Sequence, residues 1–375
     1  MRILTTHVGS LPAPPDFDAA TVHDEKALRA AVEWVVHEQR AVGLDIVNEG
    51  ELTKQGDWLA FMDHRLGGFE ERPVPAGGSV VSRGQDRESF ADFYRYALER
   101  QTLFFTADNR MKLVRKYTAA TGPITYNGQA ALEREIDTLR AVVGDPSNCF
   151  LTSTAPASLE PYRGNEYYKT AEEFVWALAE ALRVEYEAIV GAGFLLQVDD
   201  AWTAALWDRI GIEMGLDAFK RRCHVRVEAL NNALRNVPAD RVRYHLCWGS
   251  WHGPHAFDLP MADLVDVMLA VKARYYSFEA ANVRHEHEYR VWERVALPDD
   301  KVLLPGVVTH STDLVEHPEL VSERLQRFVR LVGPERVIAS TDCGFGGRTH
   351  PQIAWAKLRS LCEGAALASA ALHLV

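Results

Sequence analysis

Two side chains that bind metals stand two residues apart in the segment Arg241–Trp248, RVRYHLCW. If this segment forms a β-strand, His245 and Cys247 project from the same face, because side chains alternate across a strand. Imidazole and thiolate are both ligands that zinc favours. Two ligands do not make a catalytic site, so the rest of the chain has to supply others.

Two further candidate ligands follow other β-like segments. Glu279 comes directly after Tyr275–Phe278, and Cys343 comes shortly after Val337–Ser340. Ligands of types N, S, O and S suit tetrahedral zinc, and thiolates favour zinc over magnesium or calcium. Their wide spacing fits no zinc-finger pattern, which favours a site assembled across a larger fold. The alternative is structural, since a buried cysteine is usually a small hydrophobic side chain and Glu279 can cap a helix.

The elements that would position these residues follow a repeating order. Short β-like segments alternate with helical stretches, among them Ala171–Gly191 and His317–Val332, which is the pattern of β/α units around a parallel sheet. We therefore expect a (β/α)8 TIM barrel formed by residues 1–375 as one domain, with its active site at the C-terminal ends of the strands. The expected strands are Ile3–Val8, Leu44–Asn48, Phe150–Thr154, Leu195–Val198, Val242–Trp248, Tyr275–Phe278, Val302–Val308 and Val337–Ser340.

Residues 52–122 interrupt this order after the second expected strand. They are polar, contain several glycines and are long for one connection. We expect an insertion over one end of the barrel that serves as a lid or as a contact in a homo-oligomer. Pro123–Asn127 is expected as an accessory hairpin strand.

The composition excludes several classes of protein. The chain has 375 residues, of which 47% are hydrophobic and 25% are charged, and no run approaches the roughly 18 apolar residues of a membrane span. Its N-terminus lacks the pattern of a signal peptide, and five widely spaced cysteines do not suit a disulfide framework. The net charge of −11 argues against nucleic acid as a partner. We expect a cytoplasmic protein that binds small molecules and no membrane.

A resemblance to a known family rests on four segments, HLCWGSWHGPH, FEAANVRHEHE, LLPGVVTHSTDLVEHPEL and VIASTDCGFGG, and extends back to THVGSLP near the start. Together they resemble the cobalamin-independent methionine synthase family, in its short single-barrel branch, which also includes epoxyalkane:coenzyme M transferases. The resemblance implies a barrel with catalytic zinc at the residues that match His245, Cys247, Glu279 and Cys343. It also implies that the zinc binds a substrate thiol as thiolate and that an alkyl group is transferred to the sulfur.

Other positions carry the resemblance further. The segment Val8-Gly9-Ser10 resembles the one that holds homocysteine in the synthases, and Glu51 resembles their acidic amine-binding residue. The pair Asp199-Asp200 resembles the Asp-Glu pair that follows the fourth strand. The chain resembles a single barrel without the synthases' additional N-terminal barrel, and it has Ala201 where they have proline. The resemblance therefore implies thiol alkylation and leaves methionine synthesis itself open.

The leaving group, an amine or an alkoxide, needs a proton. The candidate donors are His310, His7 and Asp200, in that order. His310 lies near the family's proton-donating histidine, although matching it requires a gap of one residue. Each has a structural alternative, since His7 can hydrogen-bond across the strand ends and Asp200 can cap the following helix.

Aromatic side chains are the candidates for an apolar pocket that receives the alkyl donor. We expect Trp248 and Trp251 to line it, whereas Trp202 fits ordinary core packing equally well. The other histidines near these motifs are expected to form a loop wall, in the case of His252 and His255, and a solvated segment or support for a ligand carboxylate, in the case of His285 and His287.

The first hypothesis is thus a zinc-dependent alkyltransferase with a small thiol acceptor and a small alkyl donor, with a methyl-carrier protein among the donors considered. The alternative within the same chemistry is epoxide opening by a thiol, for which Arg284 or Arg348 would bind a sulfonate. Other classes are a metal-free barrel resembling uroporphyrinogen decarboxylase and a non-catalytic zinc barrel that binds thiols. Metal analysis separates the decarboxylase-like hypothesis from the others.

Overall fold

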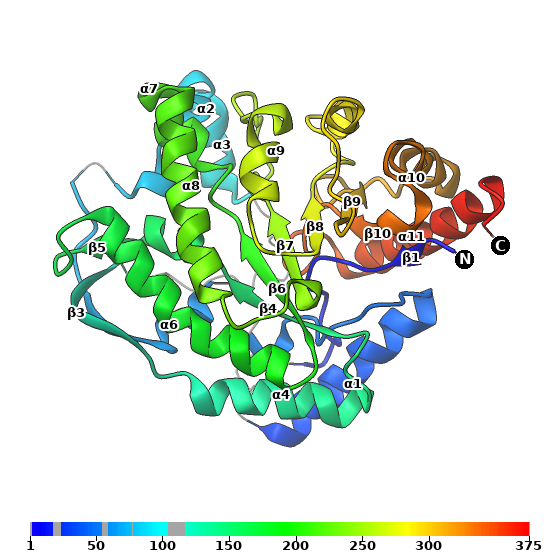
Figure 1. Ribbon diagram of the computed structural model, residues 1–375, viewed down its shortest axis with the longest axis horizontal. Helices are drawn as coiled ribbons and strands as arrows, with labels where there is room; N and C mark the ends of the chain where they lie inside the picture. Colours follow the sequence, from blue (N-terminus) through cyan, green and yellow to red (C-terminus); the bar gives the residue numbers. More distant parts are fainter. Residues whose placement is uncertain (1, 18–23, 55–58, 77, 104–116, 375) are drawn as a thin grey trace.

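A curled parallel sheet organises the protein. The computed structural model describes residues 2–17, 24–54, 59–76, 78–103 and 117–374 (Figure 1). Within these ranges seven strands form a parallel sheet in the order β1-β10-β9-β8-β7-β6-β4. Their bounds are β1 (Leu4–Thr5), β4 (Phe150–Thr154), β6 (Leu195–Asp200), β7 (Val242–Leu246), β8 (Tyr275–Phe278), β9 (Val302–Val308) and β10 (Ile338–Thr341).

The second expected strand, Leu44–Asn48, requires a correction. In this described segment only Val47 pairs as in a sheet, through an isolated parallel bridge to Cys149. The segment nevertheless lies between the two edge strands of the sheet, because the backbone N–H of Ile46 donates to the carbonyl of Thr5 in β1 at 3.1 Å. The expected eight-stranded barrel is therefore confirmed in part, as an α/β fold with seven parallel strands in one curled sheet.

The side chain of Asp45 explains why the segment forms so little ladder. Its carboxylate accepts a hydrogen bond from the backbone N–H of Thr5 at 2.9 Å and from the Thr5 hydroxyl at 3.0 Å. A donor that would pair with a neighbouring strand is thus taken by a side chain, which is how aspartate competes with regular secondary structure.

The curl of the sheet is visible in its inner core. Side chains from strands that lie far apart in the sheet order meet in one buried cluster, which includes Phe150 of β4 at one edge and Ile338 of β10 near the other. A flat sheet could not bring these two positions together. The cluster consists of Ile46, Phe150, Leu195, Val302, Leu304 and Ile338.

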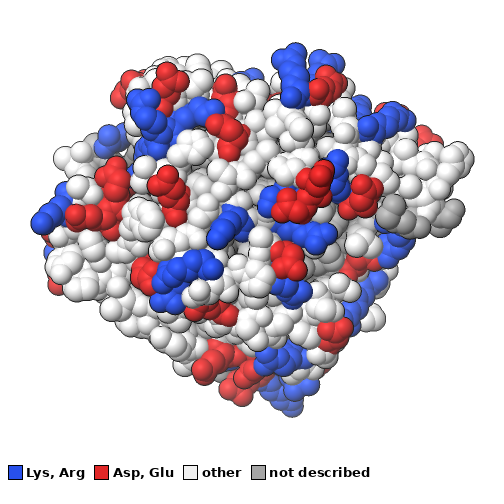
Figure 2. Space-filling model, viewed as in Figure 1, with Lys and Arg blue, Asp and Glu red and all other residues white. Residues whose placement is uncertain are grey.

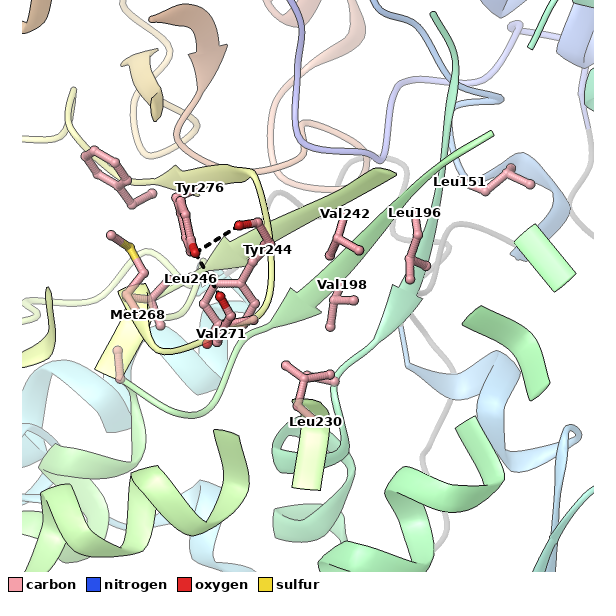
Figure 3. Close-up of a cluster of buried hydrophobic side chains, with 14 of the residues drawn as sticks. Leu151, Leu196, Val198, Leu230, Val242, Tyr244, Leu246, Met268, Val271 and Tyr276 are labelled. Carbon is pink, nitrogen blue, oxygen red and sulfur yellow. Dashed lines mark hydrogen bonds between the residues drawn. The ribbon is translucent and has the colours of Figure 1, made fainter. Parts of the chain in front are cut away.

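Helices cover the outer face of the sheet (Figure 1). Figure 3 shows part of this layer, where Tyr244 and Leu246 of β7 pack near Met268. The hydroxyl of Tyr276 in β8 donates to the carbonyl of Val271 at 2.8 Å, so a polar group in this apolar layer is satisfied. The helices are α1 (Glu25–Val42), α4 (Gln129–Val143), α5 (Pro156–Leu159), α6 (Ala171–Gly191), α7 (Ile212–Met214), α8 (Leu216–Ala233), α9 (Met261–Leu269), α10 (Pro318–Val332) and α11 (Pro351–Ala371).

Two of these helices coincide with the prediction because their ends are encoded locally. The hydroxyl of Thr170 accepts from the backbone N–H of Glu173 at 3.0 Å and caps α6. His317 caps α10 in the same way, by accepting from the N–H of Glu319 at 3.2 Å, and Pro318 occupies the first turn.

A second, smaller sheet lies beside the first. It contains β2 (Leu66–Glu71), β3 (Thr118–Tyr126) and β5 (Arg163–Asn165) in the order β2-β3-β5. The accessory strand expected at Pro123–Asn127 falls largely within β3, which pairs antiparallel with β2. The sequence did not predict β2 or β5. The insertion also contains α2 (Gln85–Ser89) and α3 (Ala91–Arg100), and its residues 55–58, 77 and 104–116 lie outside the described residues.

The surface shows no gathering of one sign of charge in the view of Figure 2. Lys and Arg side chains alternate there with Asp and Glu side chains. This face lacks the basic patch that nucleic-acid-binding proteins usually present. Among the helices that the structure describes, none combines the length and the apolar character needed to cross a bilayer.

Candidate functional site

Three of the four expected metal ligands meet at the C-terminal ends of β7 and β10. His245, Cys247 and Cys343 are buried, and one ligand atom from each lies within 4.8 Å of the other two. β7 ends at Leu246, but the backbone N–H of Cys247 donates to the carbonyl of Asp200 at 3.0 Å and continues the pairing with β6. His245 and Cys247 therefore remain two residues apart on extended backbone, as the sequence predicted.

The imidazole of His245 is arranged as a metal ligand would be. Its Nδ1 lies 3.1 Å from the hydroxyl of Ser277 in β8. Its Nε2 is buried and makes no hydrogen bond to a nitrogen or oxygen atom of the described residues, and the imidazole contacts the thiol of Cys343. A metal-binding histidine typically uses one ring nitrogen for the metal and the other for a polar neighbour, so this donor set fits a metal ion.

The thiols of Cys247 and Cys343 shift each other's pKa in opposite directions. The pKa of Cys343 lies well below its usual value because of its contact with Cys247, although burial opposes the shift. The same contact, together with burial, raises the pKa of Cys247. The pair thus favours one thiolate, and a bound cation would favour the second, since metal coordination deprotonates a thiol.

Glu279 lies directly beside this cluster. Its Oε1 is 3.6 Å from the sulfur of Cys247 and accepts the backbone N–H of Trp248 at 3.0 Å. The side-chain amide of Asn282 donates to Oε2 at 2.5 Å. Both carboxylate oxygens are therefore held in place next to the three other expected ligands.

Glu279 is not one of the three residues grouped above but belongs to a separate group of side chains that could hold a metal ion, with His310 and Asp342, whose ligand atoms lie within 4.8 Å of one another. One oxygen of Asp342 accepts the N–H groups of Ala280 and Ala281 at 2.7 and 2.9 Å. Its other oxygen and Nδ1 of His310 are buried without partners in the described chain. Burial lowers the pKa of His310 to about 3, so its ring is neutral at neutral pH.

Two buried carboxylates form an acidic pole next to these groups. Asp199 pairs in register with His245, and Oε1 of Glu51 accepts the hydroxyl of Thr152 at 3.1 Å. A Cβ at Gly9 would lie only 2.3 Å from Oε1 of Glu51, so glycine is needed there for the close approach. Burial raises the pKa of Glu51 to about 8, with a contribution from Asp199, and burial raises the pKa of Asp199 to about 6.

The backbone of Glu51 has an unusual conformation. Its φ of 60° lies in the left-handed region, which residues other than glycine rarely adopt. Such a conformation persists only where the surroundings enforce it, and it is often found at binding and catalytic sites.

Glu51→Gln tests the charge state of this pocket. Because the pKa of Glu51 is raised from 4.5 to about 8 in the folded chain, the folded state binds more protons than the unfolded state between these values. The free energy of unfolding then falls as the pH rises. We expect wild type to lose stability relative to the variant between about pH 5 and about pH 8, by at most about 1.4 kcal/mol per pH unit. Urea denaturation of both proteins across this range measures the difference, and parallel pH profiles would contradict the shift.

Ser10 lies against the loop that follows Cys343. Its carbonyl accepts the backbone N–H groups of Phe345 at 2.8 Å and Gly346 at 3.1 Å. Its hydroxyl accepts Nη1 of Arg348 at 3.2 Å. The structure therefore brings Gly9 and Ser10 between the acidic pole and the loop that carries a thiol ligand.

Two of the expected proton donors are engaged elsewhere. Nε2 of His7 lies 2.8 Å from the side-chain carbonyl of Gln39, and burial lowers the pKa of His7 to about 3. The carboxylate of Asp200 accepts the hydroxyls of Tyr244 at 2.8 Å and Thr203 at 2.7 Å. It also accepts the N–H of Thr203 at 2.9 Å, so Asp200 caps the turn after β6, which is the structural alternative.

The two expected tryptophans have different surroundings. Trp248 is fully buried, and its ring lies 4.4 Å from that of His285. The ring of Trp251 stacks on His255 at 4.1 Å, and its Nε1 donates to the hydroxyl of Tyr94 in α3 at 3.0 Å. The loop that carries Trp251 is thus held by the insertion. Trp202, which was expected to fit core packing equally well, is buried against Tyr162.

His255 of this loop and His285, which follows β8, share a carboxylate. Asp258 accepts from Nδ1 of His255 at 2.9 Å and from Nε2 of His285 at 3.1 Å. Burial alone would lower the pKa of His285, but its hydrogen bonds to Asp258 and Glu288 raise it to about 10. His252 and His255 lie in the loop after β7 and are half-buried, His287 is exposed, and His285 binds carboxylates other than Glu279.

Sequence reasoning missed several residues that shape the site. Ser277 stands two residues before Glu279 and so shares its strand face, which was a usable signal. Thr152 lies two residues before the last residue of β4, Thr154, and so on the strand face that ends at the site. Asp342 directly precedes Cys343. Asp258 had no local signal, because only the folded loop brings it to the two histidines.

Comparisons with known proteins show what the whole chain is similar to. No family model matches the chain. A methionine synthase of Sulfurisphaera tokodaii is 22% identical over 374 residues, which cover 96% of this chain and 90% of that protein, and one of Sulfolobus acidocaldarius is 24% identical over 374 residues with the same coverage.

Two solved structures share the fold. A B12-independent methionine synthase of Shewanella sp. W3-18-1, in complex with selenomethionine, superposes with a TM-score of 0.72 at 18% identity and covers 100% of both chains. A putative vitamin-B12 independent methionine synthase of Listeria monocytogenes has a TM-score of 0.64 at 20% identity and covers 98% of both chains. Over nearly its whole length, the chain therefore resembles the cobalamin-independent methionine synthase family.

Proposed function

We propose that the protein is a zinc-dependent methyltransferase that transfers a methyl group from a small donor to the sulfur of a small thiol resembling homocysteine. The observation that carries this proposal is the meeting of His245, Cys247 and Cys343 at the ends of parallel strands, with an imidazole nitrogen that has no nitrogen or oxygen partner among the described residues. The likeness to methionine synthases over 96% of the chain supports the class of reaction.

Zinc fits this donor set because two thiolates and an imidazole select it over harder cations. When bound, zinc supplies a way to keep a substrate thiol as its nucleophilic thiolate at neutral pH. The chain's own groups fix the ligands. Ser277 orients His245, and the backbone N–H of Trp248 and the amide of Asn282 hold Glu279, the proposed fourth ligand.

The acidic pole indicates the kind of thiol. Glu51 and Asp199 are two buried carboxylates close enough for the charge of one to raise the pKa of the other. Lys54 lies near enough to lower both pKa values, but its ion pairs are with Glu135 and Glu49. An ammonium group on the substrate would stabilise the charged form of the two carboxylates further. This favours an amino-acid thiol over the thiol sulfonate of the epoxide-opening alternative, which has no ammonium group.

The remaining expectations become parts of the same proposal. His310 is the proposed proton donor for the leaving group, because it lies beside Glu279 while His7 and Asp200 have other partners. The ring of His310 is neutral at neutral pH, so in this proposal it first takes up the proton that the acceptor thiol loses and then donates it to the leaving group. We propose that Leu44–Asn48 closes the sheet into a (β/α)8 barrel. The insertion at residues 52–122 forms one wall of the site through the contact between Tyr94 and Trp251.

A panel of acceptors and donors tests the proposed function. The zinc-loaded protein is incubated with homocysteine, cysteine or 2-mercaptoethanesulfonate, each with methylfolate, methylcobalamin, S-methylated small molecules or an epoxide, and the products are identified by mass spectrometry. We expect methylation of an amino-acid thiol at sulfur. Reaction of the thiol sulfonate with an epoxide alone would assign the alternative chemistry, and the absence of any S-alkylated product would overturn the proposal.

A further inference from the structure

The insertion is tied to the loop that follows β7. This loop begins at Cys247 and ends where α9 starts. The backbone N–H of His252 donates to the carbonyl of Leu103, just after α3, at 2.7 Å. Further along the loop, the N–H of Ala256 donates to Oδ1 of Asp86 in α2 at 2.9 Å. The insertion therefore holds the backbone of this loop at two points.

Trp251 is the side chain of the loop that packs into the insertion. Its ring belongs to a small buried cluster, separate from the main core, whose other members all come from the insertion. The cluster consists of Tyr94, Ala97, Leu103 and Trp251. Nε1 of Trp251 donates to the hydroxyl of Tyr94 at 3.0 Å, and this hydroxyl donates to Oδ2 of Asp86 at 2.6 Å. The insertion thus contacts both the apolar ring and its one polar atom.

Two further groups pack on the same indole. The guanidinium of Arg209 lies 4.8 Å from the ring centre of Trp251, and the ring of His255 stacks on it at 4.1 Å. Arg209 belongs to a π-helical turn, Trp207–Gly211, which is a rare conformation found frequently at functional sites. Cation–π and stacking contacts depend on ring orientation, so the indole is fixed in orientation as well as in position.

The fixed indole is connected to Cys247 through Gly249. The φ of Gly249 is 102°, in the left-handed region, and a Cβ at this position would lie 1.9 Å from a ring carbon of Trp251. The ring therefore lies directly against the backbone of Gly249. The N–H of Gly249 donates to the sulfur of Cys247 at 3.2 Å. The position of this donor thus depends on the position of Trp251.

We propose that Tyr94 is a positioning residue of the metal centre, which acts through Trp251 on the sulfur of Cys247. By fixing the indole, Tyr94 keeps the N–H of Gly249 on that sulfur. This inference rests on the proposed function, since it takes Cys247 as a metal ligand. A hydrogen bond to a thiolate stabilises its charge and makes it a weaker nucleophile. The bond therefore favours transfer of the alkyl group to the sulfur of the substrate over alkylation of the protein's own ligand.

Tyr94→Phe tests this role, because it keeps the ring in the cluster and removes both hydrogen bonds of the hydroxyl. Metal-free protein is treated with iodoacetamide, and alkylation of Cys247 is followed by mass spectrometry of the peptide that contains it. We expect Cys247 to react roughly 2- to 10-fold faster than in wild type, the effect of losing one hydrogen bond. Cys223, which is 1% exposed in α8, should keep its rate, because the change is confined to the loop.

A spectroscopic measurement follows the sulfur itself. With cobalt(II) in place of zinc, a thiolate ligand gives a charge-transfer absorption, whose energy falls when the sulfur loses a hydrogen-bond donor. We expect this absorption at longer wavelength in Tyr94→Phe than in wild type. Trp251→Phe, which removes the indole N–H, should shift the absorption in the same direction. The double variant should shift it no further, because both changes act through one contact.

Tyr168→Phe is the matched control. The hydroxyl of Tyr168, which precedes α6, accepts the N–H of Ile124 in β3 at 2.8 Å, so this variant also loses a tyrosine hydrogen bond but at the smaller sheet. It should leave both measurements unchanged. A Tyr94→Phe protein that matches Tyr168→Phe in labelling rate and in cobalt spectrum would overturn the inference. Faster labelling of Cys223 together with Cys247 would also overturn it, because the whole fold would then have loosened.

Labelling of the metal-free protein without substrate distinguishes failure of this inference from failure of the proposed function. Faster labelling of Cys247 alone in Tyr94→Phe supports the inference even if wild type methylates no thiol, and that second result would overturn the proposed function alone. Unchanged labelling, with methyl transfer by wild type, would overturn the inference and leave the proposed function in place.

Discussion

Replacing Cys343 with serine is expected to remove bound zinc from the protein and to abolish methyl transfer to a thiol. Cys343 lies with His245 and Cys247 in one buried group, and a serine hydroxyl is a far poorer zinc ligand than a thiolate. Even partners that only orient metal ligands change affinity about 10- to 100-fold, so loss of a ligand should exceed that range. Zinc per chain and product formed are measured on the same preparations.

The other cysteines provide the controls for this result. Cys247→Ser should behave like Cys343→Ser, since both thiols belong to the group. Cys362→Ser should keep the zinc and the activity, because Cys362 lies in α11 and is outside the group. Retention of zinc and full activity in Cys343→Ser would instead make the cysteines incidental, as in the decarboxylase-like hypothesis.

Arg65→Met is expected to lower the free energy of unfolding by about 3–5 kcal/mol, because it leaves the buried Glu185 without its cation and leaves Glu135 with Lys54 alone. Nη1 of Arg65 lies 2.9 Å from Glu185, and Nη2 lies 2.6 Å from Glu135. Both glutamates are at most 1% exposed in their side chains. Urea denaturation measures the change.

An exposed ion pair between the insertion and the residue after β5 gives the comparison. Arg72 pairs with Glu166 at 2.9 Å, and the two side chains are 31% and 49% exposed. Arg72→Met should therefore leave the free energy of unfolding nearly unchanged. An Arg65→Met protein within 1 kcal/mol of wild type would show that the buried network does not anchor the insertion to α4 and α6.

Three strands were predicted with the bounds that the structure has, whereas the expected strand Ile3–Val8 is a strand only at Leu4–Thr5. Phe150–Thr154, Tyr275–Phe278 and Val302–Val308 have the predicted bounds. Leu44–Asn48 failed because the carboxylate of Asp45 takes the N–H of Thr5, a contact between residues far apart in the chain. Strand β2 of the smaller sheet was not predicted for a similar reason, since it pairs with a strand that follows it by about 50 residues.

The site was predictable where alternation along a strand decides the direction of a side chain. Asp199 pairs in register with His245 and shares its face, so the next residue, Asp200, had to face the helices. Alternation along the strand alone predicts that Asp199 and Asp200 face opposite sides of the sheet. The burial of Arg348 could not be predicted, because it depends on Ser10 and Ser250 in loops that meet only in the fold.

The most direct test of the proposed zinc chemistry is removal and return of the metal. We predict that the purified protein contains about one zinc per chain, that chelation abolishes methyl transfer to the amino-acid thiol, and that zinc restores it while magnesium does not. Full methyl transfer by the chelated, metal-free protein would contradict the central claim.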